Sequence, residues 1–170
     1  MMRERLWVVM GVSGSGKSTL GRLLAERLAL PFVEGDDEHP PSNLAKMRAG
    51  RALDDADRLP WLLRLRERIA EAHEAGTGLV LTCSALKHSY RDLLREGDCA
   101  PVFLHLHGDA ILLHNRLRAR EGHFMPASLL LSQLRDLEPL STDEIGLRLD
   151  PTLQPEQLIE QIFHAFGEKN

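Results

Sequence analysis

The sequence lacks an excess of positive charge, and it has few cysteines. Its 21 lysines and arginines are outnumbered by 25 aspartates and glutamates, which gives a formal net charge of -4. Such a chain offers no broad basic surface that would hold nucleic acid nonspecifically, so the expected partner is a small molecule. The two cysteines, Cys83 and Cys99, have no C-x-x-C spacing. This pattern argues against a disulfide scaffold and favours a reduced protein of the cytoplasm.

Long hydrophobic runs are also missing. No apolar segment approaches the roughly 20 residues that a membrane-spanning helix needs, and the apolar run at 6–10 is too short for the core of a signal peptide. We therefore expect no contact with a membrane. A chain of 170 residues that is 43% hydrophobic can bury a core without disulfides or metals as staples. Residues 1–170 are accordingly predicted to form a single domain.

One segment carries a strong chemical signal. The sequence Gly-Val-Ser-Gly-Ser-Gly-Lys-Ser at 11–18 follows an apolar run and precedes a helical pattern. This is a phosphate-binding P-loop, G-x-x-x-x-G-K-S, in its strand-turn-helix context. Backbone N–H groups of such a loop point at an anion, Lys17 reaches the β- and γ-phosphates, and the Ser18 hydroxyl is a ligand for Mg²⁺. The nucleotide-binding residues predicted here are Gly11, Val12, Ser13, Gly14, Ser15, Gly16, Lys17, Ser18 and Thr19.

Apolar runs and helical patterns alternate along the rest of the chain. Strands are predicted at 6–10, 31–34, 79–83, 102–106 and 145–149. Helical periodicity and capping residues predict helices near 17–28, 41–49, 55–75, 88–95, 109–120, 127–137 and 155–166. Asp54, with Asp57 three residues on, is the predicted N-cap of the helix at 55–75. Strands that alternate with helices indicate an α/β fold, in which a parallel sheet is covered by helices on both faces.

Acidic residues follow the second predicted strand, whereas the third strand ends in Cys83-Ser84 without a carboxylate. Switch GTPases and motors depend on an acid at the end of such a strand, so these classes are disfavoured. Glu34 and Asp36 are two residues apart and would point the same way if the strand is still extended there. Glu34 could then hold Mg²⁺ through water, while Asp36 accepts the hydroxyl proton of a phosphoryl acceptor. A solvated acidic turn is an equally good interpretation of the local sequence.

Several segments together resemble gluconokinases of the small P-loop type, which are related to shikimate and nucleoside monophosphate kinases. The segments are Gly35-Asp36, His39-Pro40, Asn43, Lys46-Met47, Gly50, Leu53, Asp55, Asp57-Arg58, Pro60-Trp61-Leu62, Cys83-Ser84-Ala85-Leu86-Lys87, Tyr90-Arg91-Asp92, Arg116-Leu117, Arg120 and Gly122-His123-Phe124. The resemblance covers about 8–139. It implies a three-layer αβα P-loop NTPase fold with a five-stranded parallel sheet of order 2-3-1-4-5. It also implies substrate-binding helices at about 36–76, a lid at about 118–128 and, in many members, a homodimer.

The resemblance further implies phosphoryl transfer from ATP to D-gluconate with Mg²⁺, which gives 6-phospho-D-gluconate. Gluconate is a polyhydroxylated carboxylate, so its site needs a cation and several hydrogen-bonding groups. The candidate cations are Arg58, Lys87 and Arg91, and Asp36 and His39 are the candidates for the hydroxyls. Arg91 could instead pair with a neighbouring acid on the helix surface, and His39 could cap the next helix.

The predicted lid contributes further candidates. A glycine and a proline interrupt the helical pattern at 121–126, which suggests a hinged segment. Arg116 and Arg120 are four residues apart on one helix face, and both could close over the nucleotide's transferring phosphoryl group. His123 could contact phosphate or cap the lid. The segment 150–152 follows the last strand, where kinases of this shape hold adenine.

The predicted catalytic residues are Lys17, Asp36 and Arg120. Two other interpretations stay open. One is another small-molecule kinase, such as a shikimate kinase, and the other is a regulatory module that binds NTP without catalysis. Turnover with different phosphoryl acceptors separates the three.

Overall fold

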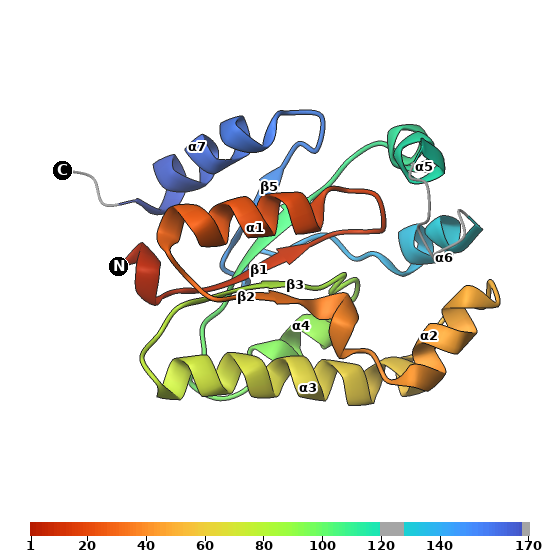
Figure 1. The fold of residues 1–170 in the computed structure, drawn as a ribbon, viewed down its shortest axis with the longest axis horizontal. Coiled ribbons are helices and arrows are strands. Elements are labelled where there is room, and N and C mark those ends of the chain that lie inside the picture. The colour runs from red at the N-terminus through yellow and green to blue at the C-terminus, as the bar shows by residue number, and fades with distance from the viewer. Residues whose placement is uncertain (120–127, 168–170) are drawn as a thin grey trace.

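The computed structural model describes residues 1–119 and 128–167. Its five strands are β1 Leu6–Met10, β2 Phe32–Glu34, β3 Leu79–Thr82, β4 Val102–Leu106 and β5 Gly146–Leu149. They form one parallel sheet of order β2-β3-β1-β4-β5 (Figure 1), which confirms the predicted fold class and strand order. Arg120, His123 and most of the predicted lid lie outside the described residues.

Helices cover both faces of this sheet. They are α1 Lys17–Leu28, α2 Pro41–Arg48, α3 Asp55–Glu74, α4 His88–Leu94, α5 Ala110–Ala119, α6 Ser128–Asp136 and α7 Pro155–Phe166. In Figure 1, α1 and α7 lie on one side of the sheet, and α3 and α4 lie on the other. Short 3₁₀ helices at Met2–Glu4 and Gly35–Glu38 were not predicted, because one turn is too short to leave a periodic pattern.

Two hydrophobic clusters hold the three layers together. Along β1, Val8 and Met10 pack with residues of α3 and α4, whereas Trp7 and Val9 pack with residues of α1 and α7. Because helices cover both faces, β1, β3 and β4 are buried at every position. This explains why nearly continuous apolar runs, rather than alternating ones, mark these strands in the sequence.

The longest helix, α3, begins at the predicted cap. Asp54 Oδ1 accepts a hydrogen bond from the Asp57 backbone N–H at 2.7 Å, and Asp57 Oδ2 accepts one from the Asp54 N–H at 2.9 Å. This reciprocal capping box satisfies two backbone donors at the helix N-terminus. The cap fixes the first two turns of α3, which carry Arg58 and Trp61.

The carboxyl ends of the strands all lie at one edge of the sheet, and α2, α5 and α6 gather beyond that edge (Figure 1). There β2 ends at Glu34, and the chain turns at once into the 3₁₀ helix Gly35–Glu38. A Cβ atom at Gly35 would lie 1.8 Å from the Thr82 carbonyl oxygen, so only glycine allows the two strand ends to come this close. The turn directs Asp36 beyond the end of the sheet.

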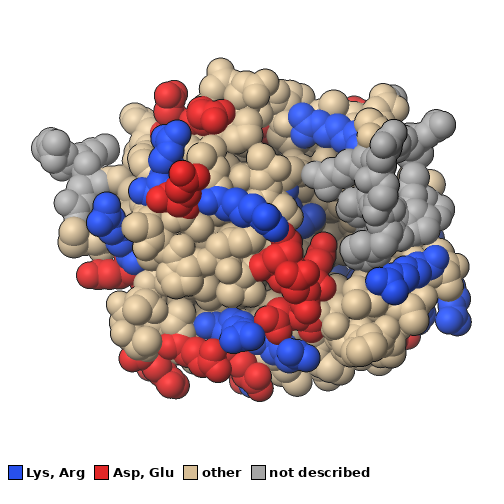
Figure 2. All heavy atoms as spheres, in the orientation of Figure 1, with Lys and Arg blue, Asp and Glu red and all other residues tan. Residues whose placement is uncertain are grey.

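Acidic and basic side chains are interspersed on the face of the molecule that Figure 2 shows. Several charged residues form ion pairs: Glu38 lies 3.2 Å from Arg64 and from Arg68, and Glu34 lies 3.7 Å from Arg22. Among the helices of 1–119 and 128–167, none is long and apolar enough to cross a membrane.

Candidate active site

The P-loop connects β1 to α1 in the predicted place. Gly11 has a φ of 146°, and a Cβ atom there would lie 2.8 Å from both the Leu106 carbonyl oxygen and Ser15 Oγ. Gly14 and Gly16 also have positive φ values, of 82° and 96°. These conformations are open to glycine and costly for other residues. They let the loop turn tightly and present its N–H groups to an anion.

One pocket lies along the outer side of this loop, between the loop, α5 and the segment that follows β5. Its lining includes Gly14, Ser15, Gly16, Thr19, Arg116, Pro151, Thr152 and Gln154. Arg116 Nη2 donates to the Pro151 carbonyl oxygen at 2.6 Å, which ties α5 to the segment after β5. The Ser15 hydroxyl is buried and has no hydrogen-bond partner among the described residues. The pocket therefore joins the phosphate-binding loop to the predicted adenine segment, so we call it the nucleotide pocket.

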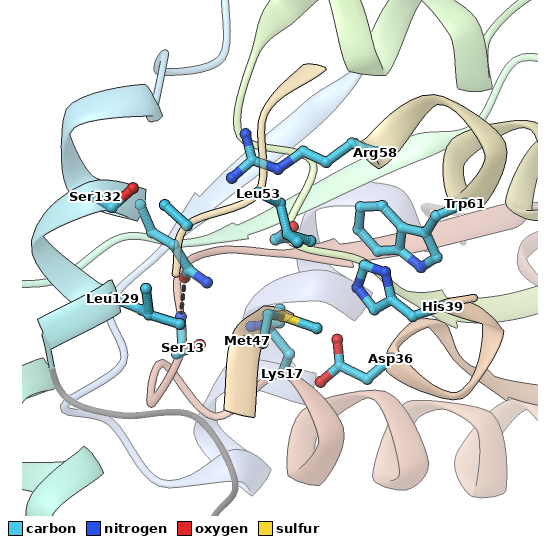
Figure 3. Close-up of a pocket in the computed structure, with 13 residues that line it drawn as sticks. Ser13, Lys17, Asp36, His39, Met47, Leu53, Arg58, Trp61, Leu129 and Ser132 are labelled. Carbon is cyan, nitrogen blue, oxygen red and sulfur yellow. Dashed lines mark hydrogen bonds between the residues drawn. The ribbon is translucent and has the colours of Figure 1, made fainter. Parts of the chain in front are cut away.

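A second pocket lies on the other side of the loop and is drawn in Figure 3. Its lining is Ser13, Lys17, Asp36, His39, Met47, Ala52, Leu53, Arg58, Trp61, Ser84, Leu129, Ser132 and Gln133. In the figure, Trp61, His39 and Asp36 lie on one side, Leu129 and Ser132 on the other, and Lys17 between them. We call it the acceptor pocket. It brings together Lys17, Asp36, His39 and Arg58, four of the side chains predicted from the sequence.

A tryptophan anchors the acidic turn of the acceptor pocket. Trp61 Nε1 donates to the Gly35 carbonyl oxygen at 2.8 Å. The His39 ring stacks on the Trp61 ring with centroids 4.1 Å apart and an interplanar angle of 14°. The start of α2 has no side-chain cap, so His39 does not have the alternative role of helix cap. Asp36 lies between these anchored residues and is held at the pocket wall.

His39 is a neutral hydrogen-bonding group at physiological pH. Burial, and to a smaller extent the charge of Arg58, lowers the pKa of His39 to about 4. Asn43 Nδ2 donates to the Asp57 carbonyl oxygen at 2.9 Å and lies 3.2 Å from His39 Nδ1. An amide NH₂ group can only donate, so Nδ1 is the acceptor and the proton of the neutral ring is on Nε2. His39 is thus a donor through Nε2.

Arg58 is the one predicted gluconate-binding cation that lines the acceptor pocket among the residues described. Its Nη1 donates to the Tyr90 hydroxyl at 2.9 Å and to Asp136 Oδ2 at 3.1 Å. Its Nε and Nη2 groups make no hydrogen bond to any residue of the described segments. The guanidinium is therefore held by two neighbours and keeps donors for an anion in the pocket.

The other two predicted cations, Lys87 and Arg91, do not line the acceptor pocket. Lys87 Nζ pairs with Asp55 Oδ1 at 2.9 Å and does not line the acceptor pocket. The Arg91 side chain is fully buried: Nε and Nη2 donate to Glu144 at 2.6 and 3.0 Å. Its remaining donors bond to backbone carbonyl groups, namely those of Ala85, Leu86 and Pro139. The Arg91 side chain thus has no donor left for a substrate, and its pair with Glu144 is buried rather than the surface pair that was its alternative.

Glu34 also differs from the prediction. The extended strand ends at Glu34, and only Asp36 of the two acids lines the acceptor pocket. Glu34 Oε1 accepts from the Thr82 hydroxyl at 2.6 Å, and Oε2 lies 3.7 Å from Arg22. The same Thr82 hydroxyl accepts from the Gly35 N–H at 3.0 Å. Glu34 thus braces the β2–β3 junction and lines neither pocket.

Sequence reasoning missed the wall that α6 contributes to the acceptor pocket. Leu129, Ser132 and Gln133 line the pocket, and Gln133 Oε1 accepts from the Ser13 backbone N–H at 2.7 Å. These three residues match no motif. The available signal was weak: Ser132 and Gln133 are neutral polar residues that interrupt a leucine-rich helical pattern.

A P-loop between two pockets, on the carboxyl edge of a parallel sheet, defines a P-loop phosphotransferase that acts on a small molecule. Residues 6–140 match the family described as an AAA domain. A gluconokinase from Gluconobacter oxydans (strain 621H) is 48% identical over 97% of this chain and 93% of its own length. By these matches, the chain belongs to the gluconokinase family.

Two crystal structures are similar to the chain throughout. A sugar kinase from Janibacter sp. HTCC2649, in an unliganded structure, has a TM-score of 0.90 and 51% identity, and the match covers 94% of this chain and 92% of that chain. A gluconokinase from Sinorhizobium meliloti 1021 has a TM-score of 0.81 and 44% identity, covering 93% of this chain and 89% of that chain.

The buried Arg91–Glu144 pair generates a stability prediction. Changing Glu144→Gln should lower the free energy of unfolding by about 3–5 kcal/mol, because it leaves a buried guanidinium without its counter-charge. The matched control is Glu96→Gln, which removes the exposed partner of Arg66 and should cost under about 1 kcal/mol. Urea unfolding monitored by circular dichroism measures both variants. Equal losses of unfolding free energy in the two variants would show that the buried Arg91–Glu144 pair stabilises the fold no more than an exposed pair.

Proposed function

We propose that this protein is a gluconokinase, which transfers the γ-phosphoryl group of ATP to the primary hydroxyl of D-gluconate. The products are ADP and 6-phospho-D-gluconate. One observation carries the proposal: the nucleotide pocket and the acceptor pocket meet at the P-loop. Ser13 and Lys17 face the acceptor pocket, while Gly14, Ser15 and Gly16 face the nucleotide pocket. A phosphoryl group bound by the loop is thus beside an acceptor on its other side.

The acceptor pocket suits a polyhydroxylated carboxylate. Arg58 supplies a guanidinium with available donors, the preferred partner of a carboxylate. Asp36 supplies acceptors, and the neutral His39 supplies a donor through Nε2, so both can bind hydroxyl groups. Met47 and Leu53 give the pocket an apolar side that excludes water. Exclusion of water favours transfer to gluconate over hydrolysis of ATP.

Different residues of the two pockets have different roles in the phosphoryl transfer. The hydroxyl oxygen of gluconate forms a bond to the γ-phosphorus, the bond from that phosphorus to ADP breaks, and its electron pair leaves with ADP. Asp36 orients the hydroxyl and takes its proton. Lys17 neutralises charge on the β- and γ-phosphates. Arg58 fixes the opposite end of the acceptor, which holds the reacting hydroxyl in register.

Mg²⁺ is implied by the family, and the oxygen donors beside the P-loop fit it. Ser18 is the second residue of α1, and the buried Ser15 hydroxyl nearby lacks a partner in the described part of the chain. Ser18 would hold the ion, as in other P-loop proteins. When bound, Mg²⁺ supplies neutralisation of the charge on the transferring phosphate. Because Glu34 is engaged by Thr82, we assign it no part in this site.

The test of the proposed function is a coupled assay of ADP release with a panel of acceptors: gluconate, shikimate, other sugar acids and nucleoside monophosphates. Gluconate should give the highest kcat/KM, with the product phosphorylated at the primary hydroxyl by phosphorus NMR. Preference for shikimate or a nucleotide would assign another kinase. ATP hydrolysis that no acceptor stimulates would favour a regulatory module.

Two of the candidates for the carboxylate-binding cation can be compared directly. Arg58→Met should raise the gluconate KM about 10- to 100-fold, since charge-assisted hydrogen bonds contribute about 1.5–3 kcal/mol. Lys87→Met is the matched control and should change this KM less than about 3-fold, because Lys87 lies outside the pocket. Steady-state kinetics at saturating ATP measures both. A larger effect at Lys87 than at Arg58 would reverse the assignment.

The role of Asp36 is tested by Asp36→Asn, which keeps the shape and one acceptor but removes the negative charge. The kcat should fall about 10²- to 10⁴-fold, the range for loss of a general base, and the gluconate KM should also rise. ATP affinity should change little, because Asp36 does not line the nucleotide pocket. The neighbouring exposed Asp37 provides the control, Asp37→Asn. An Asp36→Asn enzyme with unchanged kcat and KM would remove Asp36 from the mechanism.

A further inference from the structure

One face of α6 lies over the acceptor pocket and is held by contacts at two positions. Leu129 packs with Met47 and Leu53 in a small hydrophobic cluster, and Asp136 pairs with Arg58 at 3.1 Å. Gln133 lies between them along the helix. Positions 129, 133 and 136 are spaced i, i+4, i+7, so they share one face of α6. Contacts one turn before and one turn after Gln133 therefore hold its backbone in place.

The carboxamide of Gln133 is oriented by the P-loop itself. Its hydrogen-bond partner, 2.7 Å from Oε1, is the backbone N–H of Ser13, shown by the dashed line in Figure 3. A backbone N–H only donates, so the carbonyl oxygen of the carboxamide must face it. The NH₂ group is then the other end of the same rigid, planar group. The Nε2 donor of Gln133 is thereby held close to the P-loop, because it belongs to the same carboxamide as the oxygen that the Ser13 N–H binds.

This donor is at the boundary that the phosphoryl group crosses. Ser13 and Lys17 are the P-loop residues of the acceptor pocket, and the next three residues after Ser13 belong to the nucleotide pocket. In the transition state, negative charge is spread over the three equatorial oxygens of the phosphoryl group. A fixed neutral donor stabilises such charge without having to reorganise at the moment of transfer.

We propose that Gln133 is a further catalytic residue, which donates from Nε2 to an oxygen of the phosphoryl group during its transfer. This inference rests on the proposed phosphotransferase function. Gln133 keeps its proton throughout: the bond from acceptor oxygen to γ-phosphorus forms, the bond to ADP breaks, and Asp36 receives the hydroxyl proton. The Ser13 N–H has the supporting role of holding the carboxamide in the orientation that presents Nε2.

The variant that tests this is Gln133→Glu. It keeps the length of the side chain and an acceptor for Ser13, but it replaces the NH₂ donor with a negatively charged oxygen. The kcat should fall about 10²-fold or more, the typical loss for one such donor, while ADP affinity stays within about 2-fold of wild type. If Gln133 only braces the P-loop, Gln133→Glu keeps the hydrogen bond from the Ser13 N–H, and its kcat should then stay near that of wild type. That result would overturn the proposal.

The pH dependence gives a readout that a bracing role would not change. The carboxyl group introduced by Gln133→Glu has an O–H donor when it is protonated. The kcat of this variant relative to wild type should therefore rise as the pH is lowered from about 8 to about 5.5, toward the range in which glutamate side chains titrate. A kcat ratio of Gln133→Glu to wild type that stays low and does not change with pH would indicate a distorted site and contradict the proposal. Gln133→Met, which has no polar group, should lose kcat without this pH dependence.

One control variant isolates the effect of the charge at position 133. Leu131→Glu places the same charge on an exposed position of the same helix, where it should leave kcat within about 2-fold of wild type. All variants are compared with wild type on gluconate, so a wild-type enzyme that does not phosphorylate gluconate refutes the proposed function. In that case the ratio is measured on whichever acceptor the panel identifies, or on transfer to water, and still decides the role of Gln133.

Discussion

All five strands run in the same direction, and this constraint decides where the molecule can do chemistry. Parallel strands place the segments that follow them at a single edge of the sheet. The P-loop follows β1, the acidic turn follows β2, Ser84 follows β3, and Pro151 follows β5. Segments from opposite ends of the chain therefore contribute to two pockets that share the P-loop. Donor and acceptor can then approach one phosphoryl group from two sides, as an in-line displacement requires.

Two buried arginines, Arg58 and Arg91, differ in how many of their donors are occupied. Arg91 is surrounded by acceptors, because Glu144 takes two of its donors and backbone carbonyl groups take the rest. A guanidinium in this state has nothing left to offer a ligand. Arg58 is nearly as buried, yet only its Nη1 is engaged, by Tyr90 and Asp136, among the residues described. The number of occupied donors, rather than burial or charge, separates the structural arginine, Arg91, from Arg58, the one proposed to bind the acceptor.

The different roles of the two arginines also show which features could not be predicted from the sequence. Local signals were sufficient for the bounds of β1, α1, β4 and α7, for the P-loop and for the capping box at Asp54, since each depends on residues close together in the chain. Family resemblance added the strand order. The pairing of Arg91 with Glu144 spans 53 positions and leaves no local pattern. The direction of Glu34 depended on where β2 ends, and single-residue shifts of a strand end are not readable from composition.

Four polar groups of the acceptor pocket share one feature: a neighbouring residue fixes each of them before any substrate arrives. Trp61 holds the turn that carries Asp36, Asn43 sets the tautomer of His39, Tyr90 and Asp136 orient Arg58, and Ser13 orients Gln133. Those contacts are formed on folding, so the groups need not reorganise during the reaction. The lowered pKa of His39 fits the same arrangement. A charged imidazole beside Arg58 would be repelled by it, and a second cation near Asp36 would weaken that carboxylate as a base. Burial against Trp61 keeps the ring neutral. The roles proposed above, with Arg58 as the cation for the acceptor and Asp36 as the base, both depend on this neutral ring.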